Sequence, residues 1–582
     1  MHFGGEHFGL DAATPDLAKL DGAAPTPQAV LERNFTVKHF VNSHEDIVTQ
    51  AVDGLILAAG SGKLARLDGF PAIKVVLRAD RNPAKVAVIS GGGSGHEPGH
   101  AGFVGEGLLD AAVCGDIFAS PSVDAVLAAI LAVSGPAGCL LIVKNYNGDR
   151  LNFGLAAERA RAMGHAVEMV IVADDIALRD NPRPRGVAGV MFVHKAAGYA
   201  AAQGLSLSDV RQSAENVSNS VRSLGIAVSS CTIPGRASQD RMAAGEAELG
   251  LGIHGEPGIE RITLPPSAEL MTTMLARFGE DIRTAPRLAL LINNLGAVPA
   301  LEMGVIARDI LSSEIGRRVE LILGPAHAVT ALDMRGFSIS LMPLDDARAA
   351  MLTAPIAVAA WPQAQRPVAA VPVRPLPKAL EMIADAPSAN DKIRRSLMIA
   401  CDTLTDHQEA LDALDAKIGD GDTGSTFAAA ARRIVADLDQ LPLAEPGLLF
   451  RALANRLSLV MGGSSGVLLS ILFSAASAAM LRGEPLAEAL RAGIERMQHY
   501  GGAAEGDRTM IDALLPAVRA LGAGGSVADA AAAAQTGAAA TASMTASRAG
   551  RSSYVGAADL KGVMDPGAHA VALVFAALAE QS

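Results

Sequence analysis

Residues 86–98 read VAVISGGGSGHEP, in which a short apolar run passes directly into a glycine-rich segment. The run Val86–Ser90 is typical of a buried strand. Glycines that follow a strand let the backbone approach a polar ligand closely. A dinucleotide-binding fingerprint would need a third glycine where Glu97 or Pro98 stands, so that interpretation does not fit. The stretch therefore predicts an α/β fold with a polar-ligand site at the end of a strand.

Similar runs recur through the first 360 residues and are separated by longer helical patterns. The runs are Lys85–Ser90, Cys139–Asn145, Val167–Ala173, Arg287–Ile292 and Val319–Leu323. Strands of this length that alternate with helices are typical of α/β units. We therefore predict an α/β domain over residues 36–361.

The composition changes after Trp361. Residues 362–390 contain six prolines and little apolar periodicity, which indicates a linker. If fully extended at about 3.1 Å per residue, about 25 residues would span roughly 80 Å, enough to carry the next domain to a neighbouring subunit. In residues 391–582, Ala and Leu recur at helical spacing, which predicts an all-helical second domain. Residues 1–35 hold acidic and proline-rich pieces, and we expect a poorly ordered extension there.

The overall composition restricts the class of partner. The chain has 582 residues, of which 50% are hydrophobic and 19% are charged, enough for two or three domains. A formal net charge of −12 argues against a nucleic-acid partner, because affinity for the phosphate backbone comes from concentrated Lys and Arg. A small-molecule partner fits this composition better.

The cysteines and apolar runs bear on the compartment. The four cysteines stand far apart and form no C-x-x-C pair, which predicts a reducing, cytoplasmic location without zinc or disulfides. The longest apolar run, Val467–Leu481, falls short of the roughly 20 residues that span a bilayer. No membrane segment and no secretory signal are therefore expected.

A second motif stands at residues 414–426, which read LDAKIGDGDTGST. It places Asp415, Asp420 and Asp422 among glycines and before hydroxyl residues. At an effective dielectric constant near 20, two unit charges about 4 Å apart repel by roughly 4 kcal/mol, so three converging aspartates favour a cation between them. Mg²⁺ prefers carboxylate and phosphate oxygens, and glycines let backbone N–H groups approach a phosphate. The motif predicts a metal and phosphate loop rather than a solvated Asp-Gly turn.

Two further motifs in the first domain carry reactive side chains. Lys144 and Asp149 stand in KNYNGD after a predicted strand, at the carboxyl end where open α/β sheets usually bind ligands. His254 stands in GLGIHGEPG, where the flanking glycines leave the imidazole sterically open. From the residues alone, a surface lysine and a structural histidine remain the alternatives to functional roles.

Taken together, five segments resemble the single-chain, ATP-dependent dihydroxyacetone kinases. The segments are Gly91–Pro98, Lys144–Phe153, Gly250–Gly258, Asp415–Thr426 and Gly462–Gly466. The resemblance covers residues 36–582, with both domains in order. It implies that the first domain, built of two α/β subdomains, binds the ketose. It also implies that the all-helical second domain is a barrel that binds Mg-ATP.

By this resemblance, His254 would attack the C2 carbonyl of dihydroxyacetone and hold the substrate as a covalent hemiaminal. A neutral imidazole nitrogen is nucleophilic, and a covalent tether orients a three-carbon molecule better than non-covalent contacts. The tether also excludes glycerol, which has no carbonyl. Asp149 is the implied catalytic base for the attacking hydroxyl, with His96 assisting. The implied substrate-binding residues are Gly93, Ser94, Gly95, His96, Lys144 and Asp149.

In the second domain, the resemblance implies that Asp415, Asp420 and Asp422 bind two Mg²⁺ ions that bridge the ATP phosphates. The implied nucleotide-binding residues are Thr423, Gly424, Ser464, Ser465, Gly506, Thr509, Met510, Arg551, Asp565, Pro566 and Gly567. Phosphoryl transfer needs little covalent help, so metal charge and in-line placement would supply most of the acceleration. The family further implies a homodimer in which the helical domain serves the other subunit, which the linker would permit.

Three alternatives remain open. Erythrulose or glyceraldehyde would satisfy the same anchor, which needs only a carbonyl beside a hydroxyl-bearing carbon. Some relatives split FAD into AMP and cyclic FMN, which would use the nucleotide site with Mn²⁺. In others, held ADP is rephosphorylated by a phosphocarrier, or the protein is a regulatory binding protein. The fused domains, and Thr423 after Asp422 where relay proteins carry histidine, favour free ATP instead.

Overall fold

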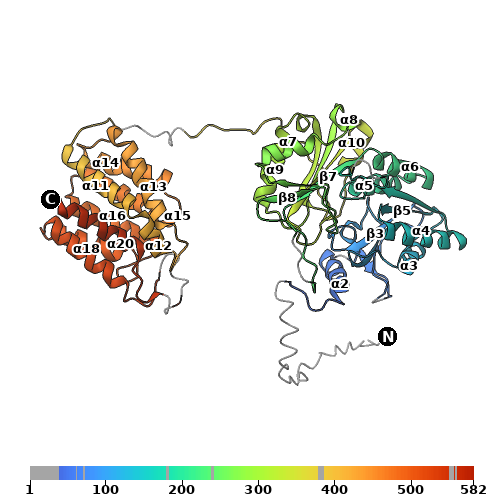
Figure 1. Ribbon diagram of the computed structural model, residues 1–582, viewed down its shortest axis with the longest axis horizontal. Coiled ribbons are helices and arrows are strands. Elements are labelled where there is room, and N and C mark those ends of the chain that lie inside the picture. The colour runs from blue at the N-terminus through green and yellow to red at the C-terminus, as the bar shows by residue number, and fades with distance from the viewer. Residues whose placement is uncertain are drawn as a thin grey trace, which may run out of the picture. The chain divides into compact units, whose positions relative to one another are not determined.

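The computed structural model describes residues 39–60, 62–69, 72–178, 182–236, 241–377, 386–548, 556 and 560–581. The chain divides into two units between Pro372 and Val373 (Figure 1). The first unit contains two sheets with their helices, and the second contains helices. The extension expected at residues 1–35 lies outside the described residues.

The first subdomain is a six-stranded sheet with the strand order β1-β2-β4-β3-β5-β6. Its strands are β1 (Leu64–Arg66), β2 (Val75–Arg78), β3 (Ala87–Ser94), β4 (Ala111–Ile117), β5 (Cys139–Lys144) and β6 (Val167–Val172). Strands β4, β3, β5 and β6 are parallel, so their carboxyl ends meet at one edge of the sheet. This edge carries the glycines of β3 and the lysine that ends β5.

Helices cover both faces of this sheet, which explains why its parallel strands are nearly continuous apolar runs. α3 (Val123–Val133) and α4 (Asn147–Ala162) pack on one face, in a core with Ile89 and Leu141. α5 (Val190–Ala202) and α6 (Leu207–Ser218) pack on the other face, in a core with Val88 and Leu140. Successive residues of β3 and β5 thus point into different cores, as the two-residue period of a strand requires. α2 (Ile47–Ala59) adds Val52 to the second of these cores.

The second subdomain is also a six-stranded sheet, with the order β11-β10-β12-β7-β8-β9. Its strands are β7 (Arg222–Ala227), β8 (Glu246–Leu249), β9 (Glu260–Thr263), β10 (Leu288–Asn294), β11 (Val319–His327) and β12 (Gly336–Pro343). α7 (Ser267–Leu275), α8 (Glu280–Arg283) and α9 (Ala300–Ser312) pack on one face. Leu291, Leu321 and Met342 instead join the core of α5 and α6, and α10 (Asp346–Thr353) packs against α5. The two subdomains therefore share one hydrophobic core, and the predicted pair of α/β subdomains is confirmed.

All the predicted strands are confirmed, but β3 extends beyond the predicted run. It continues to Ser94 because Gly91 and Gly92 pair with Val113 and Cys114 of β4. A Cβ at Gly91 would lie 2.3 Å from the Val113 carbonyl oxygen, so this pairing requires glycine. The first half of the glycine-rich segment Gly91–Pro98 is therefore the last part of the strand.

In the described residues of the second unit the regular secondary structure is helical, as predicted. Its helices are α11 (Asp391–Asp406), α12 (Gln408–Asp415), α13 (Thr423–Ala436), α14 (Pro446–Val460), α15 (Gly463–Leu481), α16 (Leu486–Gly501), α17 (Ile511–Gly522), α18 (Val527–Thr541) and α20 (Pro566–Glu580). Side chains of α11, α13, α14, α15, α17 and α20 surround an apolar cavity of about 220 Å³. The helices thus form the wall of a barrel, as expected.

The proline-rich segment that follows Trp361 begins on the first unit. Gln365 and Ile322 of β11 exchange two backbone hydrogen bonds, and Arg366 forms an ion pair with Glu320. Residues 368–377 are exposed along their whole length. The first residues of the expected linker therefore extend the edge of the second sheet.

α15 is longer than the apolar run Val467–Leu481, which was judged too short to span a membrane. Its Ser464–Leu481 part is long and apolar enough to cross a membrane, by length and composition alone. The helix packs between α14 and α16, and the core helices of soluble bundles pass the same test. One such helix is weak evidence for a membrane span.

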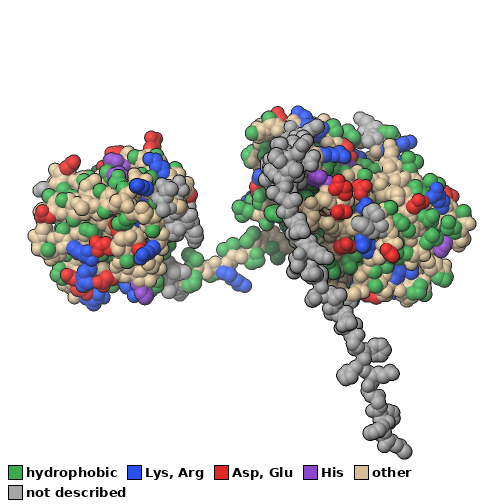
Figure 2. All heavy atoms as spheres, turned by 90° about the horizontal axis from the view of Figure 1, so that it is seen from below, with side chains coloured by type: hydrophobic (Ala, Val, Ile, Leu, Met, Phe, Trp, Pro, Cys, Tyr) green, Lys and Arg blue, Asp and Glu red, His purple; other side chains and the backbone are tan. Residues whose placement is uncertain are grey.

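The visible surface carries charges of both signs. Figure 2 shows Lys and Arg side chains scattered among Asp and Glu side chains on the faces turned to the viewer. This distribution agrees with the net charge of −12.

Candidate active site

Two neighbouring strand ends place Lys144 and Asp149 beside Gly92. Lys144 is the last residue of β5, and Asp149 lies in the first turn of α4. A Cβ at Gly92 would lie 3.5 Å from Asp149 Oδ2 and 3.6 Å from Lys144 Nζ. The φ of Gly92, +151°, is also one that side chains rarely adopt. Because Gly92 has no side chain, a small ligand can contact both charged groups over its backbone.

Burial shifts the titration of both charged groups toward their neutral forms. Burial lowers the pKa of Lys144, although the Asp149 carboxylate opposes the shift. Burial raises the pKa of Asp149, although Lys144 and a hydrogen bond from Ser120 Oγ oppose it. Lys144 Nζ has no hydrogen-bond partner among the described residues. A buried ammonium without an acceptor is costly, so this site suits a ligand with oxygen acceptors.

His96 lies just beyond β3 and is fully buried. Its Nδ1 lies 2.6 Å from the carbonyl oxygen of Thr330, which belongs to the second subdomain. Because a carbonyl oxygen only accepts hydrogen bonds, Nδ1 carries the proton and Nε2 carries the lone pair. Nε2 is buried without a partner among the described residues. Burial, and then the Lys144 charge, lower the pKa of His96 well below its usual value, so the ring is neutral.

His254 comes from the segment between β8 and β9 of the second sheet. The rings of His96, Phe118 and Tyr146 surround its imidazole, at centroid distances of 4.9, 5.3 and 4.6 Å. The His254 side chain is 19% exposed, so one part of the ring stays accessible. Asp149 lies within electrostatic range of His254. An imidazole, an ammonium and a carboxylate therefore belong to one site.

Phe118 forms part of this wall in an unusual backbone conformation. Its φ is +56°, which is uncommon for an aromatic residue. A Cβ at Gly93 or Gly95 would come within 2.8 Å of Phe118. Gly95 therefore leaves space for the Phe118 ring against His254, and Gly93 leaves space for the backbone of Phe118.

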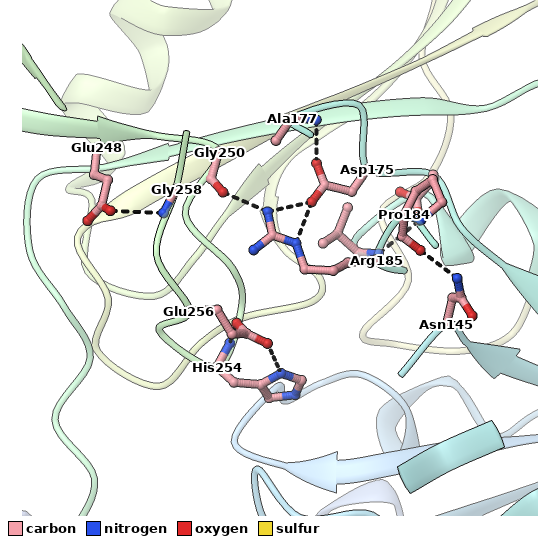
Figure 3. A network of polar contacts seen from close by, with 12 residues as sticks. Asn145, Asp175, Ala177, Pro184, Arg185, Glu248, Gly250, His254, Glu256 and Gly258 are labelled. Carbon is pink, nitrogen blue, oxygen red and sulfur yellow. Dashed lines mark hydrogen bonds and ion pairs between the residues drawn. The ribbon is translucent and has the colours of Figure 1, made fainter. Parts of the chain in front are cut away.

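A polar network holds the His254 segment against the first subdomain (Figure 3). Glu256 accepts a hydrogen bond from the backbone N–H of His254 at 3.0 Å, and its other oxygen lies 2.9 Å from Nδ1. Arg185 pairs with Asp175 at 2.7 Å and donates to the Gly250 carbonyl oxygen at 2.7 Å. Since Asp175 and Arg185 follow β6, they connect the edge of the first sheet to the loop that carries His254.

The structure thus brings together the predicted residues His96, Lys144, Asp149 and His254. Ser94 was predicted to bind the substrate, but its hydroxyl is already engaged within the sheet. Its Oγ donates to the Gly115 carbonyl oxygen at 2.7 Å. Sequence analysis missed five residues of the site. They are Phe118, Ser120, Tyr146, Arg185 and Glu256. Tyr146 and Glu256 stand inside the KNYNGD and HGEPG motifs. Their position within these motifs was the only sign in the sequence that they could belong to the site.

The predicted metal loop connects α12 to α13. Asp415 ends α12, and its Oδ2 accepts hydrogen bonds from the backbone N–H groups of Gly421, Asp422 and Thr423 at 3.1, 3.1 and 3.2 Å. One oxygen from each of Asp415, Asp420 and Asp422 lies within 4.8 Å of the others. Hard divalent cations such as Mg²⁺ bind carboxylate oxygens in this way and keep several waters. The residues present therefore fit the predicted metal.

The expected phosphate-binding residues lie at helix starts. Thr423 and Gly424 begin α13, and a Cβ at Gly424 would lie 2.0 Å from the Gln408 carbonyl oxygen, so glycine permits the close approach of α12. Ser464 and Ser465 lie in the first turn of α15. Unpaired N–H groups at helix starts are suitable donors for phosphate.

The remaining predicted nucleotide residues form two adjoining segments. The backbone N–H groups of Gly506 and Thr509 both donate to the carboxylate of Asp512. Met510 lies against Gly567 in the first turn of α20, where a Cβ would come within 3.3 Å of the Met510 side chain. Arg551 lies outside the described residues.

Asp565 connects these segments to the metal loop. It caps α20, where Pro566 is the first residue, by accepting a hydrogen bond from the Ala568 N–H at 2.7 Å. Burial raises the pKa of Asp565 to about 6, Arg508 opposes the shift, and Asp512 and Asp415 add to it. The metal loop, the segment before α17 and the start of α20 are therefore within electrostatic range of one another.

Comparisons with known proteins agree with this two-site arrangement. Residues 57–360 match the Dak1 domain, and residues 417–580 match the DAK2 domain. The chain is 50% identical over 550 residues to the dihydroxyacetone kinase of Citrobacter freundii, covering 93% of this chain and 99% of that one. It is 40% identical over 577 residues to the triokinase/FMN cyclase of Mus musculus, covering 93% of this chain and 98% of that one.

A solved structure supports the same class. The crystal structure of the C. freundii dihydroxyacetone kinase in complex with AMP-PNP and Mg²⁺ matches with a TM-score of 0.72 at 48% identity, covering 94% of this chain and 100% of that one. Fold and matches define a two-domain kinase with one Dak1 and one DAK2 domain. The chain belongs to the dihydroxyacetone kinase family.

Proposed function

We propose that the protein transfers the γ-phosphate of ATP to dihydroxyacetone and forms dihydroxyacetone phosphate. The grouping of His254 with Lys144 and Asp149 in one site carries this proposal. An imidazole can bind a carbonyl carbon, and the two charged groups suit the hydroxyls on either side. The similarity to the C. freundii dihydroxyacetone kinase favours this substrate.

In this function, His254 anchors the substrate covalently. Nε2 forms a bond to the C2 carbon, the carbonyl π bond breaks, and the oxygen takes up a proton to give a hemiaminal. A substrate without a carbonyl cannot bind in this way, so glycerol is excluded. The rings of His96, Phe118 and Tyr146 limit the space around the adduct.

Asp149 is the base that accepts the proton of the attacking hydroxyl. Because burial raises its pKa, it is a stronger base than an exposed aspartate. Ser120 orients one carboxylate oxygen through its hydrogen bond. Lys144 contributes donors to the substrate oxygens, and the neutral His96 offers an acceptor at Nε2.

In the helical unit, Asp415, Asp420 and Asp422 hold two Mg²⁺ ions. These ions supply positive charge that offsets the charge of the phosphates during transfer. Thr423, Gly424, Ser464 and Ser465 hold phosphate oxygens through hydroxyl and N–H donors. Residues 506–510 and 565–567, with Arg551, hold the rest of the nucleotide.

We further propose a cytoplasmic homodimer in which each helical domain serves the ketose site of the other subunit. The exposed segment of residues 368–377 supports this arrangement, because such a segment can extend at about 3.1 Å per residue. Mixing a His254→Ala protein with an Asp420→Asn protein tests it. Activity recovered on mixing supports exchange of domains, and no recovery in mixed dimers contradicts it.

The substrate is tested with an ADP-release assay over dihydroxyacetone, both erythrulose enantiomers, glyceraldehyde and glycerol. We expect the highest kcat/KM with dihydroxyacetone and none with glycerol. A preference above about tenfold for a four-carbon sugar, about 1.4 kcal/mol of transition-state binding, would contradict the proposed substrate.

A second activity deserves a separate test because the mouse relative is a triokinase/FMN cyclase. The candidate reaction is the Mn²⁺-dependent splitting of FAD into AMP and cyclic FMN at the nucleotide site. Incubation with FAD and Mn²⁺, followed by chromatography, decides it. The absence of cyclic FMN would dismiss this activity without affecting the kinase.

A further inference from the structure

Glu256 contacts His254 with both of its carboxylate oxygens. Oε1 lies 2.9 Å from Nδ1 of the imidazole, and Oε2 accepts the backbone N–H of His254 at 3.0 Å. A Cβ at Gly252 would lie 2.0 Å from Oε2. The glycine that precedes the histidine in the motif therefore leaves the space that this carboxylate fills.

The charge of Glu256 determines where the imidazole proton sits. Burial acts to raise the pKa of Glu256, but the hydrogen bonds and charge of His254 outweigh it and lower that pKa to about 2. An ionised carboxylate can only accept hydrogen bonds. Nδ1 must then carry the ring proton, which leaves the lone pair on Nε2.

The surroundings leave Glu256 available for this contact. Arg185 lies near the same glycine, with Nη1 2.7 Å from a Cβ at Gly252, but it pairs with Asp175 and the Gly250 carbonyl. Figure 3 shows the His254 and Glu256 pair beside this network. The edge-on ring of Tyr146, 4.6 Å away, restricts the plane of the imidazole.

We propose that Glu256 is the positioning residue that fixes His254 in its Nδ1–H tautomer and so makes Nε2 the nucleophile. The inference rests on the proposed covalent role of His254. In the step, the Nε2–C2 bond forms, the carbonyl π bond breaks, and the oxygen takes a proton from a solvent water, which leaves as hydroxide. Nδ1 keeps its proton, and the ring, now positively charged, pairs with Glu256. An aspartate orients the histidine of serine proteases by the same principle.

The chain offers a matched control in Glu248. It is buried and accepts the backbone N–H of Gly258 at 2.8 Å, so it supports the same segment (Figure 3). None of its described contacts is to His254. Glu248→Gln therefore removes a charge from the end of β8 that supports this loop, without touching the imidazole.

The Glu256→Gln variant distinguishes control of the tautomer from simple loss of a contact that holds His254 in place. If its amide oxygen accepts the backbone N–H of His254, its NH₂ group faces Nδ1 and donates to it. The ring proton then moves to Nε2, which loses its lone pair. Alanine at position 256 leaves the tautomer free instead. Glu256→Gln should therefore be more damaging than Glu256→Ala.

The test measures the rate of adduct formation with dihydroxyacetone in the full-length protein, by rapid quenching and mass spectrometry. We expect losses of about 10- to 100-fold for Glu256→Ala and on the order of 10²- to 10⁴-fold for Glu256→Gln. Glu256→Asp should regain part of the rate, and Glu248→Gln should stay near wild type. Equal rates for Glu256→Gln and Glu256→Ala, or for Glu256→Gln and Glu248→Gln, would overturn the inference.

A second readout separates this inference from the covalent anchor. In full-length protein labelled with ¹⁵N-histidine, the ring shifts of His254, assigned by their loss in His254→Asn, report the tautomer. We expect Nδ1–H in the wild type and Nε2–H in Glu256→Gln. If the wild type forms no adduct but shows Nδ1–H, the covalent anchor fails and the role of Glu256 in setting the tautomer stands. Nε2–H in the wild type would overturn that role even if the adduct forms.

Discussion

The ketose site and the aspartate loop differ in how they expose their charged groups. Lys144, Asp149 and His96 are buried, whereas Asp420 and Asp422 are exposed. At the first site, side chains from two subdomains are held in buried positions, and Lys144 Nζ and His96 Nε2 have no hydrogen-bond partner among the described residues. At the second, a local loop holds carboxylates that repel one another until a cation binds. We infer that the first site is preorganised and that the second is completed by metal and nucleotide.

The largest expected effect comes from His254→Ala, which removes the centre of the preorganised site. Without the covalent tether, we expect no adduct by mass spectrometry and a loss of kcat/KM on the order of 10⁴-fold or more. Because the helical unit is unchanged, Mg-ATP binding measured by calorimetry should remain near wild type. An intact adduct in the variant would refute the role of His254.

Asp149→Asn should lower kcat on the order of 10²- to 10⁴-fold, because the base is lost while the adduct still forms. In the wild type, activity requires the ionised carboxylate, and burial raises the pKa of Asp149. Activity should therefore fall with decreasing pH at a higher pH than an ordinary aspartate would give. A pH profile of kcat for wild type checks this sign, and a profile unchanged by Asp149→Asn would contradict it.

A change at the exposed aspartate loop should affect Mg-ATP turnover and leave ketose binding unchanged. Asp420→Asn should lower Mg-ATP turnover on the order of 10²- to 10³-fold, since the metals contribute several kcal/mol to transfer. Adduct formation should stay near wild type, as it should after removal of Mg²⁺ with EDTA. Asp439→Asn, at an exposed aspartate paired with Arg394, is the control. If ketose binding is lost with Asp420, the two sites do not act separately.

The same contrast explains how much the sequence revealed. The convergence of the three aspartates was predicted because they lie within a few positions of one another, so a local pattern contains the whole cluster. The ketose site needs residues from both sheets, and Phe118, Arg185 and Glu256 gain their roles only from tertiary contacts. No spacing in the sequence shows that Arg185 would reach the Gly250 carbonyl.

Strand prediction was limited for a related reason. β5, with the sequence CLLIVK, is buried on both faces and was predicted from its apolar run. β4, with the sequence AAVCGDI, has few residues that favour strands and forms because β2 and β3 pair with it on either side. The pairing of Gly91 with Val113 also extends β3 past the predicted end. The existence of β4 and the length of β3 depend on pairing with neighbouring strands, which the sequence does not show.

The smallest expected effect extends the comparison to two aspartates at helix starts, one partly buried and one exposed. Burial raises the pKa of Asp565 to about 6, so the folded protein binds this proton more tightly than the unfolded chain. Stability then falls as pH rises from the ordinary aspartate pKa to about 6. Asn caps helices as well as Asp, so Asp565→Asn should stabilise the helical unit by about 1–3 kcal/mol at pH 8.

Asp529 should respond with the opposite sign. It is exposed, and hydrogen bonds from Ser526 lower its pKa, so its stabilisation is present at neutral pH and is lost as pH falls. Asp529→Asn should therefore destabilise the protein at neutral pH. Calorimetric unfolding without nucleotide or divalent metal, from pH 8 toward pH 4, measures both variants. The gain from Asp565→Asn should shrink as pH falls, because the wild-type carboxyl becomes neutral in the folded state. A gain that does not depend on pH would show that burial of the Asp565 charge is not its cause.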